Sequence, residues 1–502
     1  MTNGRWVAFL AVAAAASAGA QTNAERESRG AIARAGAIDG RLNSIIAIDP
    51  AAMAQARAID RRRADGPLFG KPVLIKDNIE AAGTLPTTAG SLALINNVTG
   101  RDAPLVARMR AANMVILGKA NLSEWANIRS NNSISGWSAV GGQTRNPFAL
   151  DRNTCGSSSG SGAAVAAGIV DLAIGTETDG SITCPASLNG IVGFKPTVGL
   201  VSRTHIVPIS ASQDTAGPMT RTVRQAAQLL SVIAGSDRAD PATTEADRRK
   251  SDYAATLDAN SLRGKRIGVM RFATGFGTDP LLSQALAVLK ARGATLVEIK
   301  KFDDKAIGGN EFTVLLTEFK AGLNAYLATT PATVQTRTLA DVIAFNKATP
   351  RELGLFGQDL FEKAEATRGY DEPGYREARE EGIAFAGRNG IDRLLKSHKL
   401  DALVGPTRAA AWPIDAVHGD QYPGGSGGYL AAIAGYPHLT VPMGHVKGLP
   451  VGLSFIGGKW DDAKILSLGF AYEQARGPLA GPSFWRSIEE TPEVEPLLEP
   501  VR

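Results

Sequence analysis

The sequence predicts a layered α/β fold, and two stretches in which strands and helices alternate carry that prediction. Apolar residues at helical spacing over residues 106–112 are followed by a short apolar run, residues 115–117, which reads as a buried strand. Further along, residues 266–270, 281–290 and 295–299 form a strand–helix–strand unit. This alternation is typical of folds in which helices cover a sheet.

The composition is that of an ordinary globular protein with enough apolar material for a large core. The 502 residues are 44% hydrophobic and 21% charged, and the formal net charge is +5. Lysines and arginines are scattered, and the nearest approach to a basic run, residues 61–63, is interpreted as a solvated helix end. We therefore expect no nucleic-acid partner.

The first twenty residues have the features of an export signal. Arg5 precedes an apolar run, residues 6–16, and small residues at 18–20 come before Gln21. A buried N-terminal helix is the alternative, but the run is apolar on all sides and ends at an Ala-x-Ala-like site. No later stretch is long and apolar enough to span a bilayer. We expect residues 1–20 to be a signal peptide and the mature protein to be periplasmic or secreted.

The remaining elements are predicted from apolar periodicity and from turn and capping residues. Helices are expected at residues 23–46, from 50, from 121, and at 163–170, 223–234, 311–327, 339–346, 375–398 and 461–473. Strands are expected at residues 72–75, 172–174, 198–200, 206–209, 402–404, 438–443 and 451–456, and polar loops at 130–153 and 210–218. Charges rise and helices lengthen over residues 235–400, which we expect to wall the site and to select the substrate.

The candidate chemistry lies in residues 155–196. This stretch holds two Gly/Ser clusters, residues 156–162 and 178–181, joined by an uncharged segment of small residues. Such clusters indicate backbone that comes close to a ligand or points N–H groups at it. The successive N–H groups of Thr178, Asp179, Gly180 and Ser181 can line one concavity, which is what an oxyanion needs.

The two cysteines, Cys155 and Cys184, flank these clusters. Export permits a disulfide between them. Because the sequence does not supply the geometry that a disulfide requires, we interpret them as two small buried thiols, with the disulfide as the alternative. No histidine stands at ligand spacing from either cysteine, so we expect no zinc site and no cofactor.

Two other motif matches fail on their context. Residues 156–160 fit the G-x-S-x-G pattern with Ser158 as nucleophile, but that pattern requires a hydrophobic strand just before it, and residues 146–154 are a polar loop. A phosphate-binding loop fails because no Gly-Lys-Ser/Thr follows.

Lys76 is the candidate base, because none of the five histidines sits in a motif that suggests one. A serine hydrolase without a histidine can use a lysine that burial or neighbouring positive charge keeps neutral. Lys76 ends the apolar strand predicted at residues 72–75 and enters a Gly/Thr/Pro loop. A lysine that is paired with Asp77 or Glu80 is the alternative.

Several motifs taken together resemble those of the amidase signature family, and the resemblance covers most of the chain outside the middle segment. The motifs are PVLIKDN at 72–78, GSSSGSG at 156–162, GTETDGS at 175–181, GFKPT at 193–197, and TVPMG at 440–444 with LPVGL at 449–453. Within the family the chain looks most similar to bacterial peptide amidases, which remove the C-terminal amide of peptides. The resemblance implies a single amidase domain over residues 21–502, with a mixed β-sheet between helical layers.

The resemblance also implies a Ser–Ser–Lys triad without a metal. Ser181 matches the nucleophile, Ser157 matches the bridging serine, whose peptide bond to Gly156 is cis in the family, and Lys76 matches the base. The implied reaction passes through an acyl-enzyme on Ser181, and the N–H groups of residues 178–181 hold the oxyanion.

Two positions depart from many family members. Where these carry Gly-Gly-Ser, this chain has Asp179 before Gly180 and Ser181, and an acid beside an oxyanion is unfavourable unless its side chain points away. Where many carry an arginine two residues after the nucleophile, this chain has Thr183, which suggests a neutral substrate. Trp412 and Tyr422, in the loop after a strand, are our candidates for substrate contact, with core or wall positions as the alternative.

We therefore expect hydrolysis of a carboxamide bond, in the C-terminal amide of a peptide or in a related neutral amide. An aryl acylamide or a fatty amide as substrate of the same triad is the first alternative. A non-catalytic protein that binds an amide ligand is the second, but a binding protein has no use for the lysine. The sequence leaves the oligomeric state open.

Overall fold

A computed structural model of the chain describes residues 23–63, 65–303, 307–424 and 426–500. The expected signal peptide lies outside the described residues. The described strands are β1 (Ile45–Ile48), β2 (Pro72–Lys76), β3 (Val115–Ala120), β4 (Trp137–Ser138), β5 (Gly142–Gln143), β6 (Leu172–Glu177), β7 (Val192–Lys195), β8 (Thr215–Thr220), β9 (Arg266–Met270), β10 (Thr295–Ile299), β11 (Ala402–Pro406), β12 (His438–Val446) and β13 (Leu449–Ile456).

The described α-helices surround these strands. They are α1 (Asn23–Ile38), α2 (Ala52–Asp60), α3 (Pro104–Ala111), α4 (Ser159–Ala166), α5 (Thr183–Leu188), α6 (Val223–Ile233), α7 (Ala246–Arg249), α8 (Asp279–Ala291), α9 (Ile307–Leu327), α10 (Leu339–Ala348), α11 (Pro350–Leu353), α12 (Asp359–Ala366), α13 (Tyr375–Ile383), α14 (Arg393–Ser397), α15 (Gly428–Ala434), α16 (Asp462–Ala475) and α17 (Glu495–Leu498).

Eleven of the described strands form one mixed sheet in the order β1-β3-β2-β6-β8-β7-β12-β13-β11-β9-β10, and β4 and β5 pair separately. The β3-β2-β6 and β11-β9-β10 neighbours run parallel, and the other neighbours run antiparallel. The expected α/β fold with a mixed sheet between helical layers is confirmed. No helix in the described parts of the chain has the length and apolar character that crossing a bilayer requires.

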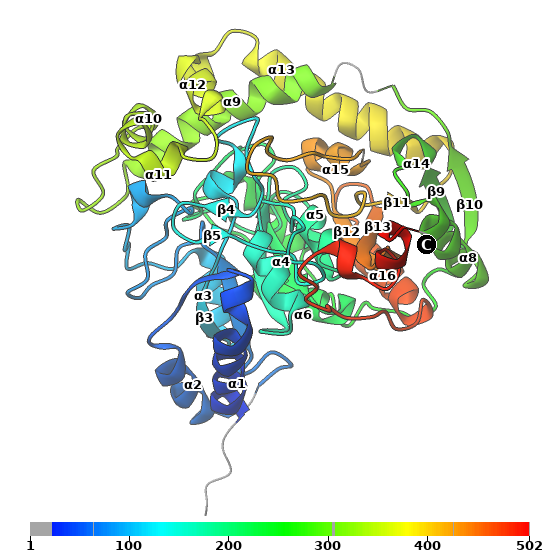
Figure 1. The fold of residues 1–502 in the computed structure, drawn as a ribbon. Coiled ribbons are helices and arrows are strands. Elements are labelled where there is room, and N and C mark those ends of the chain that lie inside the picture. The colour runs from blue at the N-terminus through cyan, green and yellow to red at the C-terminus, as the bar shows by residue number, and fades with distance from the viewer. Residues whose placement is uncertain (1–22, 64, 304–306, 425, 501–502) are drawn as a thin grey trace, which may run out of the picture.

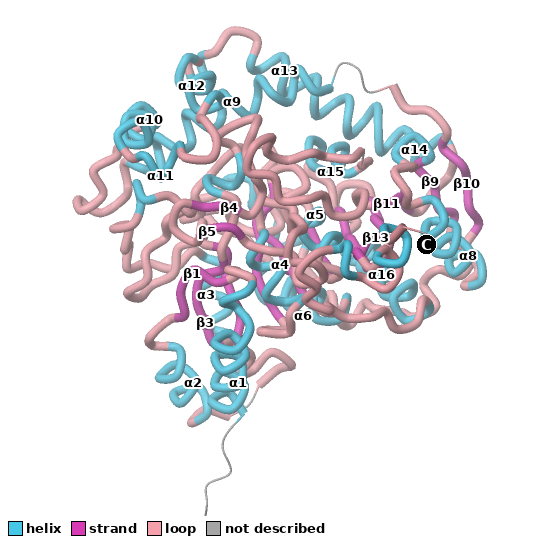
Figure 2. The backbone as a smooth tube through the Cα atoms, viewed as in Figure 1, coloured by secondary structure: helices cyan, strands magenta, loops and turns pink. Residues whose placement is uncertain are grey.

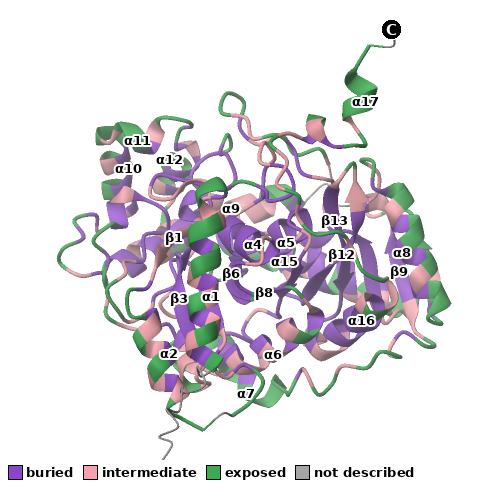
Figure 3. Cartoon of the chain, turned by 60° about the horizontal axis from the view of Figure 1, so that its bottom comes forward, coloured by how far each residue is buried: buried purple, intermediate pink, exposed green. Residues whose placement is uncertain are grey.

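Helices cover both faces of this sheet, and β2 shows how one strand serves both layers. Val73 and Ile75 point into the cluster that contains residues of α3, α6, α8 and α16, whereas Leu74 points into the cluster that contains residues of α1, α2 and α4. The alternation follows from the two-residue period of a strand. Figure 3 shows the strands buried between helices whose outer faces are exposed.

The middle of the chain forms a separate group of helices over one end of the sheet. In Figure 1, α9 to α13 lie together at the top, and α1 and α2 lie at the opposite side. Figure 2 shows that much of the chain between these helices and the sheet is loop. The inner side of α9, α10 and α12 packs around Phe319 and Phe361 in its own apolar cluster. These loops and helices enclose the candidate site.

Predictions of single elements were wrong at four places in the chain. The helix expected at residues 23–46 ends at Ile38, and Ile45–Ile48 forms an edge strand. Residues 198–200 and 206–209 form no strand; Ile206 makes only an isolated bridge to Ile79. Only a short 3-10 helix, Glu124–Asn127, follows residue 121.

The fourth of these places is the loop predicted at residues 210–218, whose second half is the central strand β8. Gly217 and Pro218 make this segment look unlike a strand in the sequence, because proline is rare in central strands and glycine weakens them. The structure explains the glycine: a β-carbon on Gly217 would lie 2.1 Å from the carbonyl oxygen of Phe194 in the neighbouring strand.

Candidate active site

Lys76 ends β2 in the interior, with no exposed surface. Its Nζ donates to Ser157 Oγ at 2.7 Å, to Thr176 Oγ1 at 2.8 Å and to the Thr176 carbonyl oxygen at 3.2 Å. All three partners are uncharged. The alternative of a Lys76–Asp77 pair is not what the structure contains, since Asp77 Oδ1 lies 3.4 Å from the Nζ of Lys119.

Burial makes Lys76 a base at neutral pH. Desolvation lowers its pKa from 10.5 to about 7, while the negative charges of Asp214 and Glu177 act in the opposite direction and raise the pKa. An amine with a pKa near 7 is neutral in half of the molecules at neutral pH. It can then accept the proton of the Ser157 hydroxyl.

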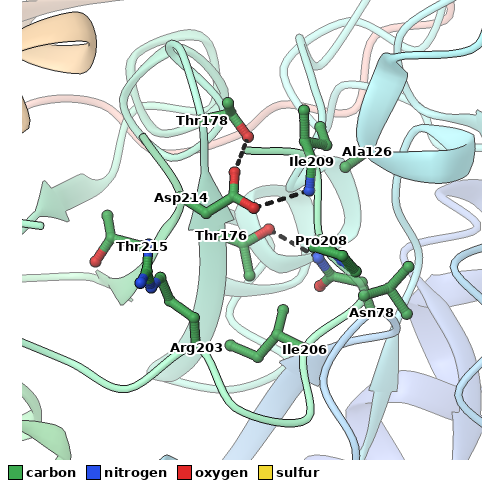
Figure 4. A pocket seen from close by; sticks show the side chains of 11 residues that line it. Asn78, Ala126, Thr176, Thr178, Arg203, Ile206, Pro208, Ile209, Asp214 and Thr215 are labelled. Carbon is green, nitrogen blue, oxygen red and sulfur yellow. Dashed lines mark hydrogen bonds between the residues drawn. The ribbon is translucent and has the colours of Figure 1, made fainter. Parts of the chain in front are cut away.

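Asp214 is held rigidly beside the lysine by three donors. Its Oδ1 accepts from Thr178 Oγ1 at 2.6 Å, and its Oδ2 accepts from the N–H groups of Ile209 and Ser210 at 2.8 and 2.9 Å. Figure 4 shows this carboxylate between Thr178 and the backbone of Ile209, with Thr176 bonded to Asn78 close by. Asp214 and Thr176 were not singled out from the sequence: Asp214 lies outside the motifs given above, and Thr176 lies within GTETDGS but has no expected role there.

Ser157 and Ser181 belong to two segments that are bonded to each other. The Gly156–Ser157 peptide bond is cis, and the N–H of Ser158 donates to the carbonyl oxygen of Ser181 at 3.1 Å. Ser157 is completely buried, whereas Ser181 is 8% exposed and faces a cavity. No hydrogen bond joins the two seryl hydroxyls among the described residues, so the structure brings Lys76 and Ser157 into contact and leaves Ser181 Oγ free.

The other serines of this cluster are occupied with structural hydrogen bonds. The hydroxyls of Ser158, Ser159 and Ser161 donate to the backbone carbonyls of Thr176, Cys155 and Ile174 at 3.0, 2.7 and 3.1 Å. The bonds of Ser158 and Ser161 tie helix α4 and its N-cap to strand β6, and the bond of Ser159 ties the helix to the loop before it.

The loop from Thr178 to Ser181 presents free backbone donors. Among the described residues, none of its four N–H groups has a protein acceptor, whereas the next two, of Ile182 and Thr183, both donate to Glu177 Oε2 at 2.7 and 2.9 Å. Gly180 has a φ of +77°, a conformation that glycine adopts without strain. Free donors next to Ser181 are suited to an oxyanion.

A disulfide connects the two catalytic segments, and here the interpretation of Cys155 and Cys184 as free thiols was wrong. The two residues are bonded, with Cα atoms 5.9 Å apart, within the range that a disulfide needs. The bond joins the residue before Gly156 to the first turn of α5, which follows Ser181. The sequence placed the cysteines near the site but did not reveal their separation.

A cavity of about 150 Å³ opens at Ser181. Its apolar lining comes from Ile128, Ile209 and Leu315, the last of which is on α9. Tyr422 also lines it. Trp412 does not line the cavity. It is buried, its ring packs edge-on against that of Tyr422 with the centroids 4.8 Å apart, and its indole nitrogen donates to Asp420. Of the two expected substrate contacts, only Tyr422 faces the cavity.

Asp179 faces this cavity too, contrary to the condition that its side chain should point away. Asp179 is exposed to solvent at the cavity. Desolvation raises its pKa to about 6, and the charge of Arg408 partly offsets that rise. Arg408 follows β11, and its Nη2 lies 3.7 Å from the position that a β-carbon would take on Gly180. The positive charge absent at Thr183 is therefore supplied from a distant part of the chain, which no local motif could reveal.

A buried lysine in contact with a serine, a second serine in a cavity and a row of free N–H groups define the class of protein: a serine hydrolase with a lysine base. Known proteins narrow this class. The Amidase family profile matches residues 29–466. A probable amidase of Arabidopsis thaliana is 40% identical over 450 residues, which are 86% of this chain and 83% of that protein.

Solved structures agree with this assignment. The peptide amidase of Stenotrophomonas maltophilia is 50% identical, with a TM-score of 0.87 over 92% of this chain and 95% of that one. A peptide amidase in complex with the competitive inhibitor chymostatin is 51% identical, with a TM-score of 0.87 over 92% and 96% of the two chains. The chain belongs to the amidase signature family, and it is an amidase that hydrolyses a carboxamide bond.

Proposed function

We propose that this amidase removes the C-terminal amide of peptides through an acyl-enzyme on Ser181. The observation that carries the proposal is the hydrogen bond of 2.7 Å between the buried Lys76 amine and Ser157 Oγ. This bond places a base next to the hydroxyl that passes the proton on. Without the lysine, the Gly/Ser loops would form only a polar binding site for an amide.

The reaction begins with two coupled proton transfers. Neutral Lys76 takes the proton of Ser157 Oγ, and Ser157 takes the proton of Ser181 Oγ as that oxygen attacks the amide carbonyl carbon. The relay requires Ser181 Oγ to turn towards Ser157 when the substrate binds; catalytic hydrogen bonds often form only in such complexes.

The attack turns the carbonyl oxygen into an oxyanion, which accepts hydrogen bonds from the free N–H groups of residues 178–181, each worth about 3–4 kcal/mol of barrier. The C–N bond breaks when this tetrahedral intermediate collapses. The proton held by Lys76 returns through Ser157 to the nitrogen of the leaving amide, which departs as ammonia. Water then hydrolyses the acyl-enzyme by the same relay and releases a carboxylic acid and Ser181.

The lining of the cavity supports a neutral, partly apolar acyl group. Ile128, Ile209 and Leu315 offer apolar surface, and the two charged residues of the lining, Asp179 and Arg408, are of opposite sign. The similarity to peptide amidases, one of them bound to chymostatin, favours a peptide over an aryl acylamide or a fatty amide.

Ammonia release tests the proposal. Purified enzyme is assayed on a capped dipeptide amide, an anilide and a long-chain fatty amide, with the Ser181→Ala variant beside it. We expect ammonia from the peptide amide, and loss of that activity in Ser181→Ala. Faster turnover of the anilide or the fatty amide would assign the enzyme to one of the alternatives. Peptide-amide hydrolysis that survives Ser181→Ala would refute the acyl-enzyme.

We also propose that the protein is exported. Residues 1–20 have the pattern of a signal peptide, and the Cys155–Cys184 bond is of a kind that persists in oxidising compartments. N-terminal sequencing of the protein recovered from the producing cells tests this. A mature chain that begins at Gln21 is expected, and a chain that retains Met1 would contradict it.

A further inference from the structure

A second cavity adjoins the one at Ser181, and the two meet at a charged ridge. The second cavity has a volume of about 360 Å³, and its far wall includes Phe272 and Tyr429. Asp179, Gly180 and Arg408 line both cavities. A ligand that extends from Ser181 into the second cavity must therefore pass the Asp179 carboxylate and the Arg408 guanidinium.

Arg408 is a cation that finds no acceptor among the described residues. Within the described parts of the chain it has no hydrogen-bond acceptor and no carboxylate within 4.0 Å; its contact is the ring of Tyr422, whose centroid lies 5.3 Å from Cζ. The side chain is only half-buried, but its N–H groups face the space next to the nucleophile loop. Such a guanidinium is suited to a ligand that brings its own acceptor.

The neighbours of Arg408 hold it in place. Thr407 is anchored in the core, where its N–H donates to the Gly452 carbonyl at 2.8 Å and its hydroxyl bonds those of Thr440 and Ser454 at 2.6 and 2.9 Å. On the other side, Tyr422 is braced by Trp412 and donates to Asp420 at 3.2 Å. The chain is therefore anchored just before Arg408, and the guanidinium lies over the ring of Tyr422.

The charges around the ridge favour a neutral ligand over an anion. Arg408 is positive, and Asp179, with a pKa of about 6, is mostly negative at neutral pH. Glu311, which accepts from Gln213 at 2.9 Å, has its pKa raised to about 8 by desolvation and by Asp179, and is mostly neutral. One acceptor and one set of donors match a trans peptide unit that lies between them, because its N–H and its C=O point to opposite sides.

We infer that Asp179 and Arg408 clamp the peptide unit that precedes the scissile amide, and that the second cavity is the subsite for the residue before it. Arg408 donates to the carbonyl oxygen of that unit, and Asp179 accepts from its N–H. This inference rests on the proposed function: it assigns to these two side chains the recognition of the N-acyl group that every peptide amide carries.

The volumes of the two cavities also support a subsite for the preceding residue in the second cavity. The cavity at Ser181 lies below the roughly 300 Å³ at which ligand pockets usually begin, whereas the second cavity exceeds that value with 360 Å³. Consecutive Cα atoms of a peptide are about 3.8 Å apart, so a substrate that holds one residue at Ser181 carries the next across the ridge.

A series of amides that differ by one group tests the clamp. The probes are 3-phenylpropanamide, phenylalaninamide, N-acetylphenylalaninamide and N-acetyl-leucyl-phenylalaninamide, each assayed for ammonia release by the mature enzyme. N-acetylphenylalaninamide should exceed 3-phenylpropanamide in kcat/KM by about tenfold or more, as expected for hydrogen bonds to charged groups. The dipeptide amide should exceed both, mainly through a lower KM.

The Arg408→Met variant assigns that preference to the guanidinium. We expect it to reduce the ratio of kcat/KM between N-acetylphenylalaninamide and 3-phenylpropanamide to near one, and Arg408→Lys to restore part of it. Arg248→Met, at an arginine whose side chain is 75% exposed and which lines neither cavity, is the matched control and should keep the wild-type ratio.

The outcomes separate the two proposals. An enzyme that releases ammonia from none of the probes refutes the proposed function. An enzyme that turns them over without a preference for the acylated forms, or prefers phenylalaninamide, refutes the clamp and leaves the amidase intact. An unchanged ratio in Arg408→Met also refutes it. If Arg408→Met does not fold, two other measurements decide whether the clamp exists. One is the same kcat/KM ratio in Arg408→Lys. The other is the affinity of folded Ser181→Ala for N-acetylphenylalaninamide compared with 3-phenylpropanamide.

Discussion

Lys76 Nζ lies 2.7 Å from Ser157 Oγ, and both side chains are closed off from solvent. Because the partners of the amine are hydroxyl and carbonyl oxygens, burial is not compensated by a directly bonded carboxylate. This is the difference from Lys119, which is equally buried but lies 3.4 Å from Asp77. The lysine of the site can lose its proton near pH 7, so both turnover and stability should depend on pH in this range.

The pH dependence of turnover should report the pKa of Lys76. We expect kcat/KM to rise through about pH 7 as the amine loses its proton. The negative charge of Asp214 raises this pKa, so Asp214→Asn should move the rise to lower pH. Asp341→Asn, at a helix cap of α10, is the control and should leave the midpoint in place. A midpoint that moves to higher pH in Asp214→Asn would contradict the assignment.

Stability should depend on pH through the same group. The pKa of Lys76 is 10.5 when exposed and about 7 in the fold, so between these values the unfolded chain binds a proton that the folded chain does not. The contribution of Lys76 to the free energy of unfolding therefore rises with pH in this window, by up to about 1.4 kcal/mol per pH unit.

Lys76→Met removes this dependence. The variant should gain most in urea midpoint over the wild type at or below pH 7, and the gain should shrink towards pH 10. Lys71→Met, at a partly exposed lysine paired with Glu27, should show no such trend. A gain that is equal at pH 6 and pH 9 would show that Lys76 is not deprotonated by burial.

The Cys155–Cys184 bond should stabilise the fold and the site together. It closes a loop of 29 residues, for which chain entropy gives about 3–4 kcal/mol. We expect Cys155→Ala/Cys184→Ala to lower the thermal midpoint and to reduce kcat, because the bond flanks both serines. The wild type should lose stability when a thiol reductant opens the bond, and the double variant should not respond. If thiol titration shows the bond open and the midpoint unchanged, the prediction fails.

Serine variants should separate the relay from its scaffold. Ser157→Ala removes the hydroxyl between Lys76 and Ser181, and we expect kcat to fall by about 10² or more, the usual worth of a positioned proton-transfer group. Ser161→Ala, which loses a 3.1 Å bond to the Ile174 carbonyl, should cost about 1 kcal/mol of stability and keep near-normal turnover. Equal losses of activity in both variants would show that Ser157 acts only in the scaffold.

The parts of the site that were predictable are those that a short stretch encodes. Lys76 at the end of an apolar strand and the Gly/Ser loops around Ser157 and Ser181 have their conformations set by neighbouring residues. The unit of β9, α8 and β10 was predicted for the same reason. Local periodicity and glycine placement act over a few residues, so they can be read without the fold.

The parts that were missed depend on distant segments. Strand β8 carries Gly217 because β7 approaches it closely. Trp412 packs against Tyr422 because a long loop folds back on itself. The same holds for the cysteines, whose sulfur atoms meet only when α5 packs beside the loop before Gly156.

By itself, the sequence determined the layered fold class, and through its resemblance to the amidase signature family it predicted Lys76, Ser157, Ser181 and the N–H groups beside them as the site. Only the tertiary structure decided that Lys76 is buried among neutral partners, that Cys155 is bonded to Cys184, and that Arg408 stands over Gly180. The physical reason is that pKa values, disulfides and ligand-facing charges are set by distances of a few ångströms between residues far apart in the chain.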